Sequence, residues 1–265
     1  MPSPAPISVK SPSRLDTALE AARRYESVVR ASSPVADSSN ASDMMTVPVS
    51  WTRVNRKRYP RFPTVPLPAA GLATLTVSET LAARRSVRTA LKPIAVEDIS
   101  AILGEAIRAR PENPLSRPYP SAGARNATEL YALVSTEGVT GLQGGTYHYD
   151  PHRHSLDVLD TLDVQDTIQK LTVAQLTDAP PLLLVFSIIL HRTCVKYGGR
   201  GLRFAYLEAG AAAMAADLSA TARSLGCCWL GGFDDHALSA AIDVSLDLDL
   251  ETPVLCLAVG SIPVP

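Results

Sequence analysis

Hydrophobic residues recur along the chain with helical spacing in several segments. The spacing predicts helices over 14–31 and 96–108, and each carries its apolar side chains on one face. Ser78 is the predicted N-cap of a short helix over 79–85. Two later helices are predicted over 163–176 and 205–225. The last of these is rich in alanine and apolar on nearly every side, so it is expected to be buried and to take part in a subunit contact.

Shorter apolar runs predict strands between these helices. The longest run, at 182–190, has the length of a strand that is buried on both faces. A hairpin is expected around 150–154, where polar residues separate two alternating segments. The predicted strands are 130–135, 145–149, 155–159, 182–190 and 253–260. This order of helices and strands indicates an α+β fold with one main sheet.

Composition excludes several classes of function. The chain has 265 residues and a formal net charge of −1, so it has no basic field that would hold nucleic acid or an anionic membrane surface. No apolar run is long enough for a membrane span, and the first residues lack the apolar core of a secretion signal. The four cysteines form no CxxC and no metal-ligand spacing, which favours a reducing cytoplasmic compartment.

The chain divides into three parts by composition. Residues 1–45 are predicted to be a flexible segment that contains the first helix, because 1–13 and 32–43 are rich in Ser and Pro or otherwise polar. Residues 46–78 form a proline-rich, basic arm. The arm either lies extended on a partner surface or is a solvated linker, and the pattern fits both. Residues 79–265 are the predicted compact domain.

Two clusters have the composition of sites for an anionic or flat ligand. R-R-S-V-R at 84–88 offers guanidinium forks that match phosphate oxygens, although a solvated basic helix end has the same composition. R-P-Y-P-S-A-G-A at 117–124 joins two prolines that fix the backbone to Gly123, which permits close approach; a plain turn is the alternative.

A third stretch, 192–210, reads R-T-C-V-K-Y-G-G-R-G-L-R-F-A-Y-L-E-A-G and concentrates cations, aromatic rings and glycines. Lys196 and Tyr197 are its candidate reactive pair, and a snorkelling lysine beside a core-edge tyrosine is the structural alternative. Gly231 and Gly232 again permit close approach or form an ordinary turn. His148, His152 and His154 are interpreted as a polar hairpin tip rather than a metal site. Neither a G-x-G-x-x-G nor a P-loop motif is present.

Taken together and in this order, these motifs resemble the flavin-dependent nitroreductase superfamily. Within it they are most similar to the peptide-azoline dehydrogenase branch, the streptolysin-type thiazole/oxazole dehydrogenases. The resemblance covers residues 79–265. It rests on R-R-S-V-R at 84–88, R-P-Y-P-S-A-G at 117–123, E-L-Y at 129–131, Y-x-Y-D at 147–150, K-Y-G-x-R-x-x-R-F at 196–204, E-A-G at 208–210, G-G-F-D-D at 231–235 and L-A-V-G at 257–260.

The resemblance implies a nitroreductase-like fold, with a central mixed or antiparallel sheet flanked by helices, and a homodimer that binds FMN at the subunit interface. It implies that Lys196 and Tyr197 are the catalytic pair. The residues it assigns to FMN are Arg84, Arg85, Ser86 and Arg88 for the phosphate and ribityl chain, with Pro120, Ser121, Ala122, Gly123, Arg200, Gly231 and Gly232 for the rest of the cofactor.

The implied reaction oxidises azoline rings of a ribosomally made peptide to azoles, with oxygen as final acceptor. A base must take one proton, and unperturbed Tyr and Lys titrate near about 10 and 10.4. A nearby ammonium stabilises a phenolate, so Tyr197 is the expected base with Lys196 tuning it, although the roles could be reversed. The implied partners are the azoline peptide, a second copy of the chain and, as a candidate, a cyclodehydratase subunit.

Two other functions remain open at this point. One is an NAD(P)H-dependent nitro or quinone reductase, or another flavin oxidase. Such reductases often carry an Asn after the proline-serine-glycine loop, where this chain has Ala124, with Asn126 nearby. The other is a non-catalytic scaffold subunit of a peptide-modifying complex. The intact arginine-serine and Lys-Tyr motifs argue against a scaffold.

Overall fold

The computed structural model of the chain describes residues 14–31, 54–69, 71–73, 75–172, 175–244 and 251–262. The disorder predicted for 1–13, the polar segment at 32–43 and the first part of the arm, 46–53, lie outside the described residues. A helix, α1, spans Arg14–Ala31, where the spacing predicts one. Within the described ranges, no helix combines the length and the apolar character needed to cross a bilayer.

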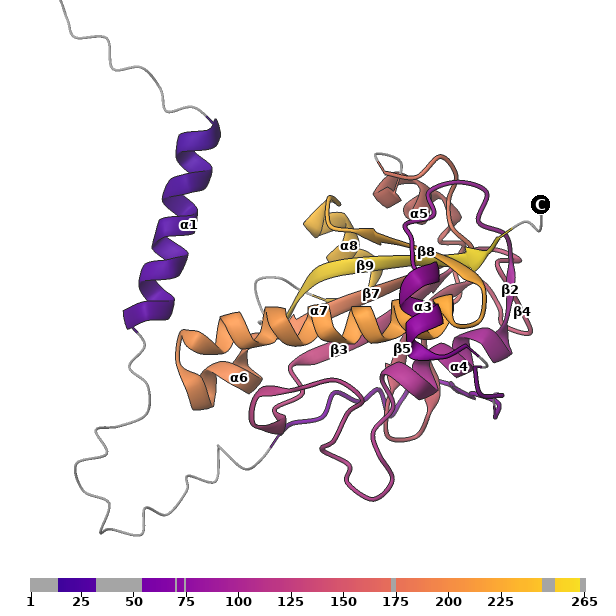
Figure 1. The fold of residues 1–265 in the computed structure, drawn as a ribbon, viewed down its shortest axis with the longest axis horizontal. Coiled ribbons are helices and arrows are strands. Elements are labelled where there is room, and N and C mark those ends of the chain that lie inside the picture. Colours follow the sequence, from indigo (N-terminus) through magenta and orange to yellow (C-terminus); the bar gives the residue numbers. More distant parts are fainter. Residues whose placement is uncertain are drawn as a thin grey trace, which may run out of the picture.

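A seven-stranded sheet forms the centre of the molecule (Figure 1), and every pair of neighbours in it is antiparallel. The strand order is β1-β6-β5-β3-β7-β9-β8. The strands are β1 (Thr64–Pro66), β3 (Thr128–Val134), β5 (Gly145–Asp150), β6 (Ser155–Asp160), β7 (Leu182–Ile189), β8 (Leu225–Leu230) and β9 (Glu251–Ser261). Two short strands, β2 (Ile94–Ala95) and β4 (Val139–Thr140), pair separately. The α+β prediction with an antiparallel sheet is confirmed.

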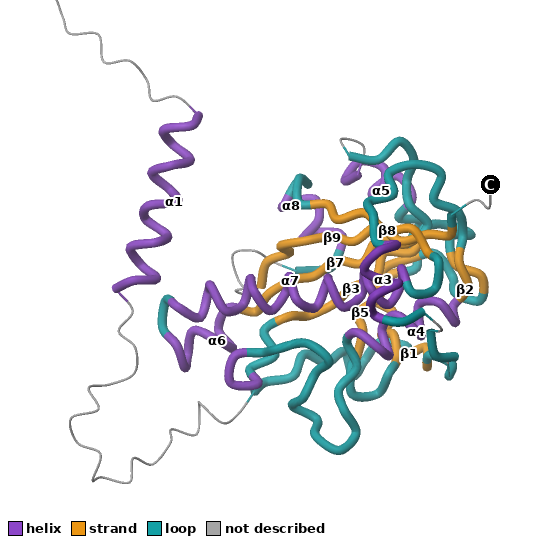
Figure 2. The backbone as a smooth tube through the Cα atoms, in the orientation of Figure 1, coloured by secondary structure: helices purple, strands orange, loops and turns teal. Residues whose placement is uncertain are grey.

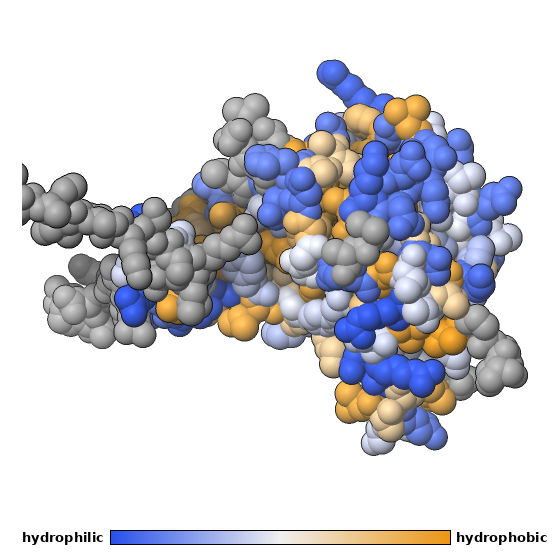
Figure 3. All heavy atoms as spheres, turned by 90° about the horizontal axis from the view of Figure 1, so that it is seen from above, coloured by the Kyte–Doolittle hydropathy of each residue, from blue (hydrophilic) through white to orange (hydrophobic). Residues whose placement is uncertain are grey.

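Helices cover both faces of this sheet, because its central strands are buried on both sides. In β7, Leu184 and Phe186 belong to one apolar cluster, with α4 (Val96–Ala106) and α7 (Arg200–Thr221). Leu183 and Val185, which point the other way, belong to a second cluster, with α5 (Gln165–Thr172) and α8 (Asp235–Ala241). The described surface seen from above in Figure 3 is a mosaic of hydrophilic and hydrophobic residues rather than one continuous apolar face.

The long helix α7 lies against the sheet through small side chains. Its fully buried residues recur at helical spacing, and they are Ala205, Ala209, Ala212, Ala213, Ala216 and Ala220. The outer face is open in the single chain, since Leu207 is 64% exposed, and its burial in a subunit contact stays a prediction. The helix also ends earlier than predicted, at Thr221. Ser224 takes a left-handed turn conformation (φ 61°) after the helix, and Gly226 lies inside β8.

A short helix, α3 (Val77–Ala83), precedes the arginine-serine motif. Its N-cap is Thr76 rather than the predicted Ser78. The Thr76 hydroxyl accepts from the Glu79 backbone N–H at 3.3 Å, and the Glu79 carboxylate accepts from the Thr76 backbone N–H at 2.8 Å. This reciprocal pair is a capping box. Glu79 three residues after Thr76 was the signal that identifies the cap.

The described part of the arm packs on this chain's own sheet, so a solvated linker was the wrong interpretation for it, and a contact with a partner stays a prediction. Thr64–Pro66 form the edge strand β1 against β6. Further back, Lys57 donates to Glu251 and to the Tyr131 hydroxyl, each at 2.6 Å. Glu251 is 2% exposed and also accepts from Ser187 at 2.6 Å. The arm is therefore held by a buried ion pair with β9.

Replacing Lys57 by Met is expected to lower the free energy of unfolding by about 3 kcal/mol, because the buried Glu251 carboxylate would lose its counter-charge. Urea denaturation of the two proteins measures the difference. Arg58→Met is the matched control, since Arg58 is exposed and forms no hydrogen bond or ion pair with the described residues. Equal losses in the two variants would contradict a specific role for the Lys57–Glu251 pair.

Candidate active site

Lys196 and Tyr197 end helix α6 (Leu190–Tyr197), and their side chains meet the loop that contains Gly123. Gly123 has a φ of +58°, which disfavours any residue with a side chain. A Cβ built there would overlap the Tyr197 hydroxyl and would lie 3.0 Å from Lys196 Nζ. The structure therefore brings together two of the sequence-predicted clusters, although 73 residues separate Gly123 from Lys196 in the chain.

A buried carboxylate fixes the loop from behind. The Ser121 hydroxyl donates to Glu208 Oε2 at 2.6 Å, and Glu208 Oε1 accepts from the Thr128 backbone N–H at 2.9 Å. The same hydroxyl accepts from the Asn126 backbone N–H at 2.8 Å. Burial raises the pKa of Glu208, although these hydrogen bonds oppose the shift. Ser121 thus shapes the loop, and the anchoring residue Glu208 was not predicted as a site residue.

The Tyr197 ring is set by its neighbours on α6 and α7. The ring packs edge-on against Phe204, with centroids 5.0 Å apart. Lys196 Nζ lies 5.4 Å from the centroid of the Tyr197 ring, within the range of a cation–π contact. Gly201 permits the tight junction of the two helices, since a Cβ there would collide with the backbone of Cys194. The Lys196 ammonium, the Tyr197 phenol and the Gly123 loop are therefore packed together at the junction of α6 and α7.

The arginine-serine motif lies elsewhere in the fold. Its backbone runs beside β8, where the Val87 N–H donates to the Cys227 carbonyl at 2.7 Å. Arg84 pairs with the buried Asp217 of α7 at 3.7 Å. Arg85, Ser86 and Arg88 are exposed.

Segment 175–177 connects this motif to the glycines that follow β8. Thr177 N–H donates to the Arg88 carbonyl at 3.3 Å, and Gln175 Nε2 donates to the Gly232 carbonyl at 2.6 Å.

The predicted site residues therefore fall into two groups at opposite ends of α7, as Figure 1 shows for α3 and α6. The lysine–tyrosine group comprises Lys196, Tyr197, Arg200 and residues 120–123. The arginine group comprises Arg84, Arg85, Ser86 and Arg88, connected to Gly231 and Gly232. Thirteen residues separate Phe204, which contacts Tyr197, from Asp217, which contacts Arg84. At about 1.5 Å per residue this is about 20 Å along the helix.

Other predicted residues have structural roles. Asn126 Nδ2 donates to the carbonyls of Leu115 (3.0 Å) and Ala124 (3.2 Å), so this amide is used inside its own loop. His152 and His154 lie half-buried in the hairpin turn, as expected, but His148 does not. His148 is fully buried in β5 and bonds Glu129 through Nε2 at 2.8 Å, and His154 bonds Tyr149 at 2.8 Å and Ser100 at 2.9 Å.

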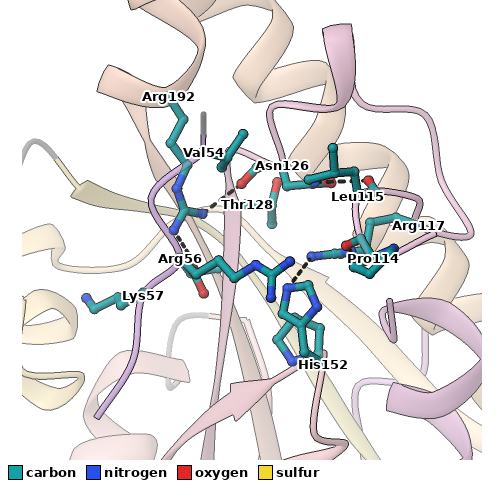
Figure 4. Close-up of a pocket in the computed structure, with 12 residues that line it drawn as sticks. Val54, Arg56, Lys57, Pro114, Leu115, Arg117, Asn126, Thr128, His152 and Arg192 are labelled. Atoms are coloured by element: carbon teal, nitrogen blue, oxygen red, sulfur yellow. Dashed lines mark hydrogen bonds and ion pairs between the residues drawn. The ribbon is translucent and has the colours of Figure 1, made fainter. Parts of the chain in front are cut away.

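A pocket lined by cationic side chains is formed by residues of α6, the 117–124 loop, the arm and the hairpin. Figure 2 draws the loops in teal. The lining of the pocket, which sequence reasoning did not predict, is shown in Figure 4. Arg56 comes from the arm, Arg117 from the 117–124 loop, and Arg192 from the first turn of α6. His152, on the hairpin, lies opposite them. These four residues are called the arginine pocket below.

Only part of the positive charge in this pocket is compensated. Arg192 pairs with the buried Glu129 at 2.5 Å. Burial alone would raise the pKa of Glu129, but Arg192 and His148 hold it at about 2, so this carboxylate is charged. Arg117 donates to carbonyl oxygens, weakly to His152 at 3.5 Å, and to the Tyr119 hydroxyl, but to no carboxylate of the described residues. Burial and the charges of Arg117 and Arg56 lower the pKa of His152 to about 4.

Gly123→Ala is expected to destabilise the protein by about 1 kcal/mol, because alanine is strained at a positive φ and its methyl group would displace Tyr197. Thermal unfolding measures the loss. Gly71→Ala is the control, since a Cβ at Gly71 meets no atom within 4 Å. Unchanged stability at position 123 would contradict the close packing of this loop on Tyr197.

The comparisons with known proteins agree with this architecture. The sequence profile described as the nitroreductase family matches residues 81–261. The predicted nitroreductase MJ1384 of Methanocaldococcus jannaschii is 30% identical over 188 residues, which cover 70% of this chain and 91% of that protein. The chain belongs to the nitroreductase family, whose members typically use a flavin cofactor.

A second relative is the microcin B17-processing protein McbC of Escherichia coli, 30% identical over 121 residues. That match covers 44% of this chain and 44% of McbC, so less than half of either chain is compared. Among solved structures, the E. coli microcin synthetase McbBCD complex with truncated pro-MccB17 bound contains a similar chain. It superposes with a TM-score of 0.61 at 21% identity and covers 83% of this chain and 84% of that one, which supports the fold.

Proposed function

We propose that this chain is an FMN-dependent dehydrogenase that oxidises azoline rings of a peptide to azoles. The observation that carries the proposal is the packing of Lys196 and Tyr197 against Gly123. The candidate proton-accepting pair is thereby held beside a loop whose Pro120 and Gly123 are exposed to an approaching ligand. The similarity to a microcin B17-processing protein supports the peptide substrate.

Two features of this structure support FMN as the cofactor. Arg85, Ser86 and Arg88 are exposed together, and guanidinium and hydroxyl groups suit the oxygens of a phosphate. At the other group, Pro120 and Gly123 are exposed beside Tyr197, so the backbone of this loop is accessible to a ligand. Bound there, FMN would supply the hydride acceptor and would return the electrons to oxygen.

The proposed chemistry of the chain itself is proton removal. Oxidation of an azoline removes one hydride and one proton from adjacent carbons, and the Tyr197 oxygen takes the proton. Lys196, with its ammonium 5.4 Å from the ring centroid, stabilises the phenolate that accepts it. Glu208 and Ser121 hold the loop in place, so they act as positioning residues.

A complete site requires two chains under this proposal. The residues of α7 that contact the two groups, Phe204 and Asp217, lie about 20 Å apart along the helix, so one chain presents the groups at separate places. A two-fold pair would place the arginine group of one copy beside the lysine–tyrosine group of the other. Exposed apolar side chains at both ends support such a contact, and they are Val77 and Leu81 on α3 and Leu207 on α7.

Further parts of the proposal concern partners and compartment. A cyclodehydratase that forms the azolines would supply the substrate and is a candidate partner, by analogy with the McbBCD complex. A reducing cytoplasm suits the four cysteines, all of which are free thiols.

The test is the visible spectrum of the purified protein under anaerobic conditions. A thiazoline-containing peptide is expected to bleach the flavin, and NADPH is expected to leave it oxidised. Bleaching by NADPH alone would replace the proposal with an NAD(P)H-dependent reductase. A colourless protein that takes up no added FMN would leave a scaffold subunit.

A further inference from the structure

We propose that the arginine pocket binds a carboxylate group of the peptide substrate, so that the enzyme prefers peptides with an acidic group close to the ring it oxidises. The inference rests on the proposed function for the identity of the ligand. The pocket itself stands on Arg56, Arg117, Arg192 and His152, which come from four separate segments of the chain and line one cavity (Figure 4).

The pocket carries positive charge that an anionic ligand would compensate. Glu129 compensates Arg192, and Glu251 compensates Lys57, which also lines the cavity. The charges of Arg56 and Arg117 have no carboxylate partner among the described residues. Several groups face His152, namely Arg117, Arg56, Asp150 and Arg58, and their net effect with burial is to disfavour its protonation. Burial is the largest cause of the lowered pKa of His152, and the charges of Arg117 and Arg56 act in the same direction.

The pocket is a built site rather than a set of mobile surface arginines. Arg192 is 6% exposed and its guanidinium donates to the Asn126 carbonyl at 2.7 Å as well as to Glu129. Arg117 is tied to the carbonyls of Pro114 (2.9 Å) and Ser116 (3.2 Å). Two guanidinium groups are thus pre-positioned, and planar guanidinium matches a carboxylate through paired N–H bonds. In Figure 4 the guanidinium of Arg56 points toward His152.

The position of the pocket connects it to the reacting centre. Arg192 is one helical turn before Lys196 on α6, about 6 Å along the axis. Arg117 opens the same loop that carries Gly123. A peptide whose azoline lies at Tyr197 would reach the pocket with a residue about two positions away, since an extended chain advances about 3.3 Å per residue. A carboxylate at that position would meet the free charge of Arg56.

The first experiment measures anion binding without any turnover. The histidine rings of the flavin-loaded protein are followed by NMR between pH 4 and 7, and His152→Gln identifies the His152 signal. N-acetylglycine is expected to raise the pKa of His152 by about one unit, because an anion beside the imidazole favours its charged form. N-acetylglycinamide, which lacks the carboxylate, is expected to leave it unchanged.

Variants make this binding test specific. Arg56→Gln is expected to raise the pKa of His152 in the absence of ligand and to abolish the further shift caused by N-acetylglycine. Lys170→Gln removes the same unit of charge from an exposed position on α5, outside the pocket, and is expected to behave like wild type. A His152 pKa that responds to inorganic phosphate but not to N-acetylglycine would overturn the carboxylate assignment.

The second experiment measures the substrate preference. Amidated thiazoline peptides that carry Asp or Asn two residues from the ring are compared, together with a peptide whose free C-terminal carboxylate occupies that position. At low peptide concentration, the flavin of the wild-type enzyme is expected to be reduced about tenfold faster by the Asp peptide than by the Asn peptide. In Arg56→Gln this preference is expected to fall below about twofold. A response only to the free C-terminus would identify the terminal carboxylate as the ligand.

The two experiments separate the two proposals. If no thiazoline peptide bleaches the flavin but N-acetylglycine shifts His152, the proposed reaction fails and the carboxylate pocket stands. If thiazoline peptides bleach the flavin with equal efficiency whatever their charge, and N-acetylglycine leaves His152 unchanged, the reaction stands and the inference is overturned.

Discussion

Tyr197→Phe is expected to slow reduction of the bound flavin by a thiazoline peptide by at least about 100-fold, since a positioned general base contributes about that much. Flavin binding is expected to remain, because phenylalanine preserves the ring that packs against Phe204. Anaerobic stopped-flow absorbance of the flavin measures the rate, and the spectrum of the purified variant measures cofactor content. Lys196→Ala is expected to be impaired as well, because the phenolate would lose the neighbouring ammonium.

The control for this prediction is Tyr206→Phe. Tyr206 is 48% exposed on α7, and its substitution removes the same hydroxyl without touching the Gly123 loop. A Tyr197→Phe protein that reduces its flavin at the wild-type rate would rule out the proposed base. If Tyr197→Phe is fast and Lys196→Ala alone is slow, the roles of the two residues are reversed.

The central strands could be predicted from sequence because their chemistry is local. Segment 182–190 is apolar except for Ser187, and β7 spans Leu182–Ile189 within it. Strand β8 could not be predicted in the same way. Its sequence, L-G-C-C-W-L, contains no β-branched residue, and Gly226 after a long helix fits a helix C-terminus equally well. This segment is a strand because it pairs with β9, from Leu225 opposite Ser261 to Leu230 opposite Cys256.

The candidate site could be predicted only as separate motifs. The composition of 117–124 and of 192–210 indicated two places where a ligand could bind, but their contact depends on the fold. Glu208 could have been recognised as an unusual acidic residue in an alanine-rich helix, and its partner Ser121 is 87 residues away. Lys57 and Glu251 are 194 residues apart. No local pattern identifies which distant carboxylate will neutralise a given cation.

The separation of the two groups along α7 predicts that two inactive variants regain activity when they are combined in one dimer. Tyr197→Phe should inactivate the lysine–tyrosine group, and a double substitution, Arg85→Ala with Arg88→Ala, should inactivate the arginine group. Each variant alone is expected to be almost inactive. When the two are unfolded, mixed in equal amounts and refolded with FMN, about one quarter of the wild-type activity is expected, because half of the dimers are mixed and each has one intact site.

This outcome depends on the two groups acting across a two-fold pair. If one chain supplied both groups to the same FMN, every site in a mixed dimer would carry one inactivating substitution, and mixing would restore nothing. Tyr197→Phe mixed with Lys196→Ala is the control, because both substitutions lie in the same group and neither arrangement predicts recovery. Recovery in that control would mean that the refolded samples contain wild-type activity from another source. Recovery only in the first mixture would require that Arg85 and Tyr197 of different chains serve one cofactor.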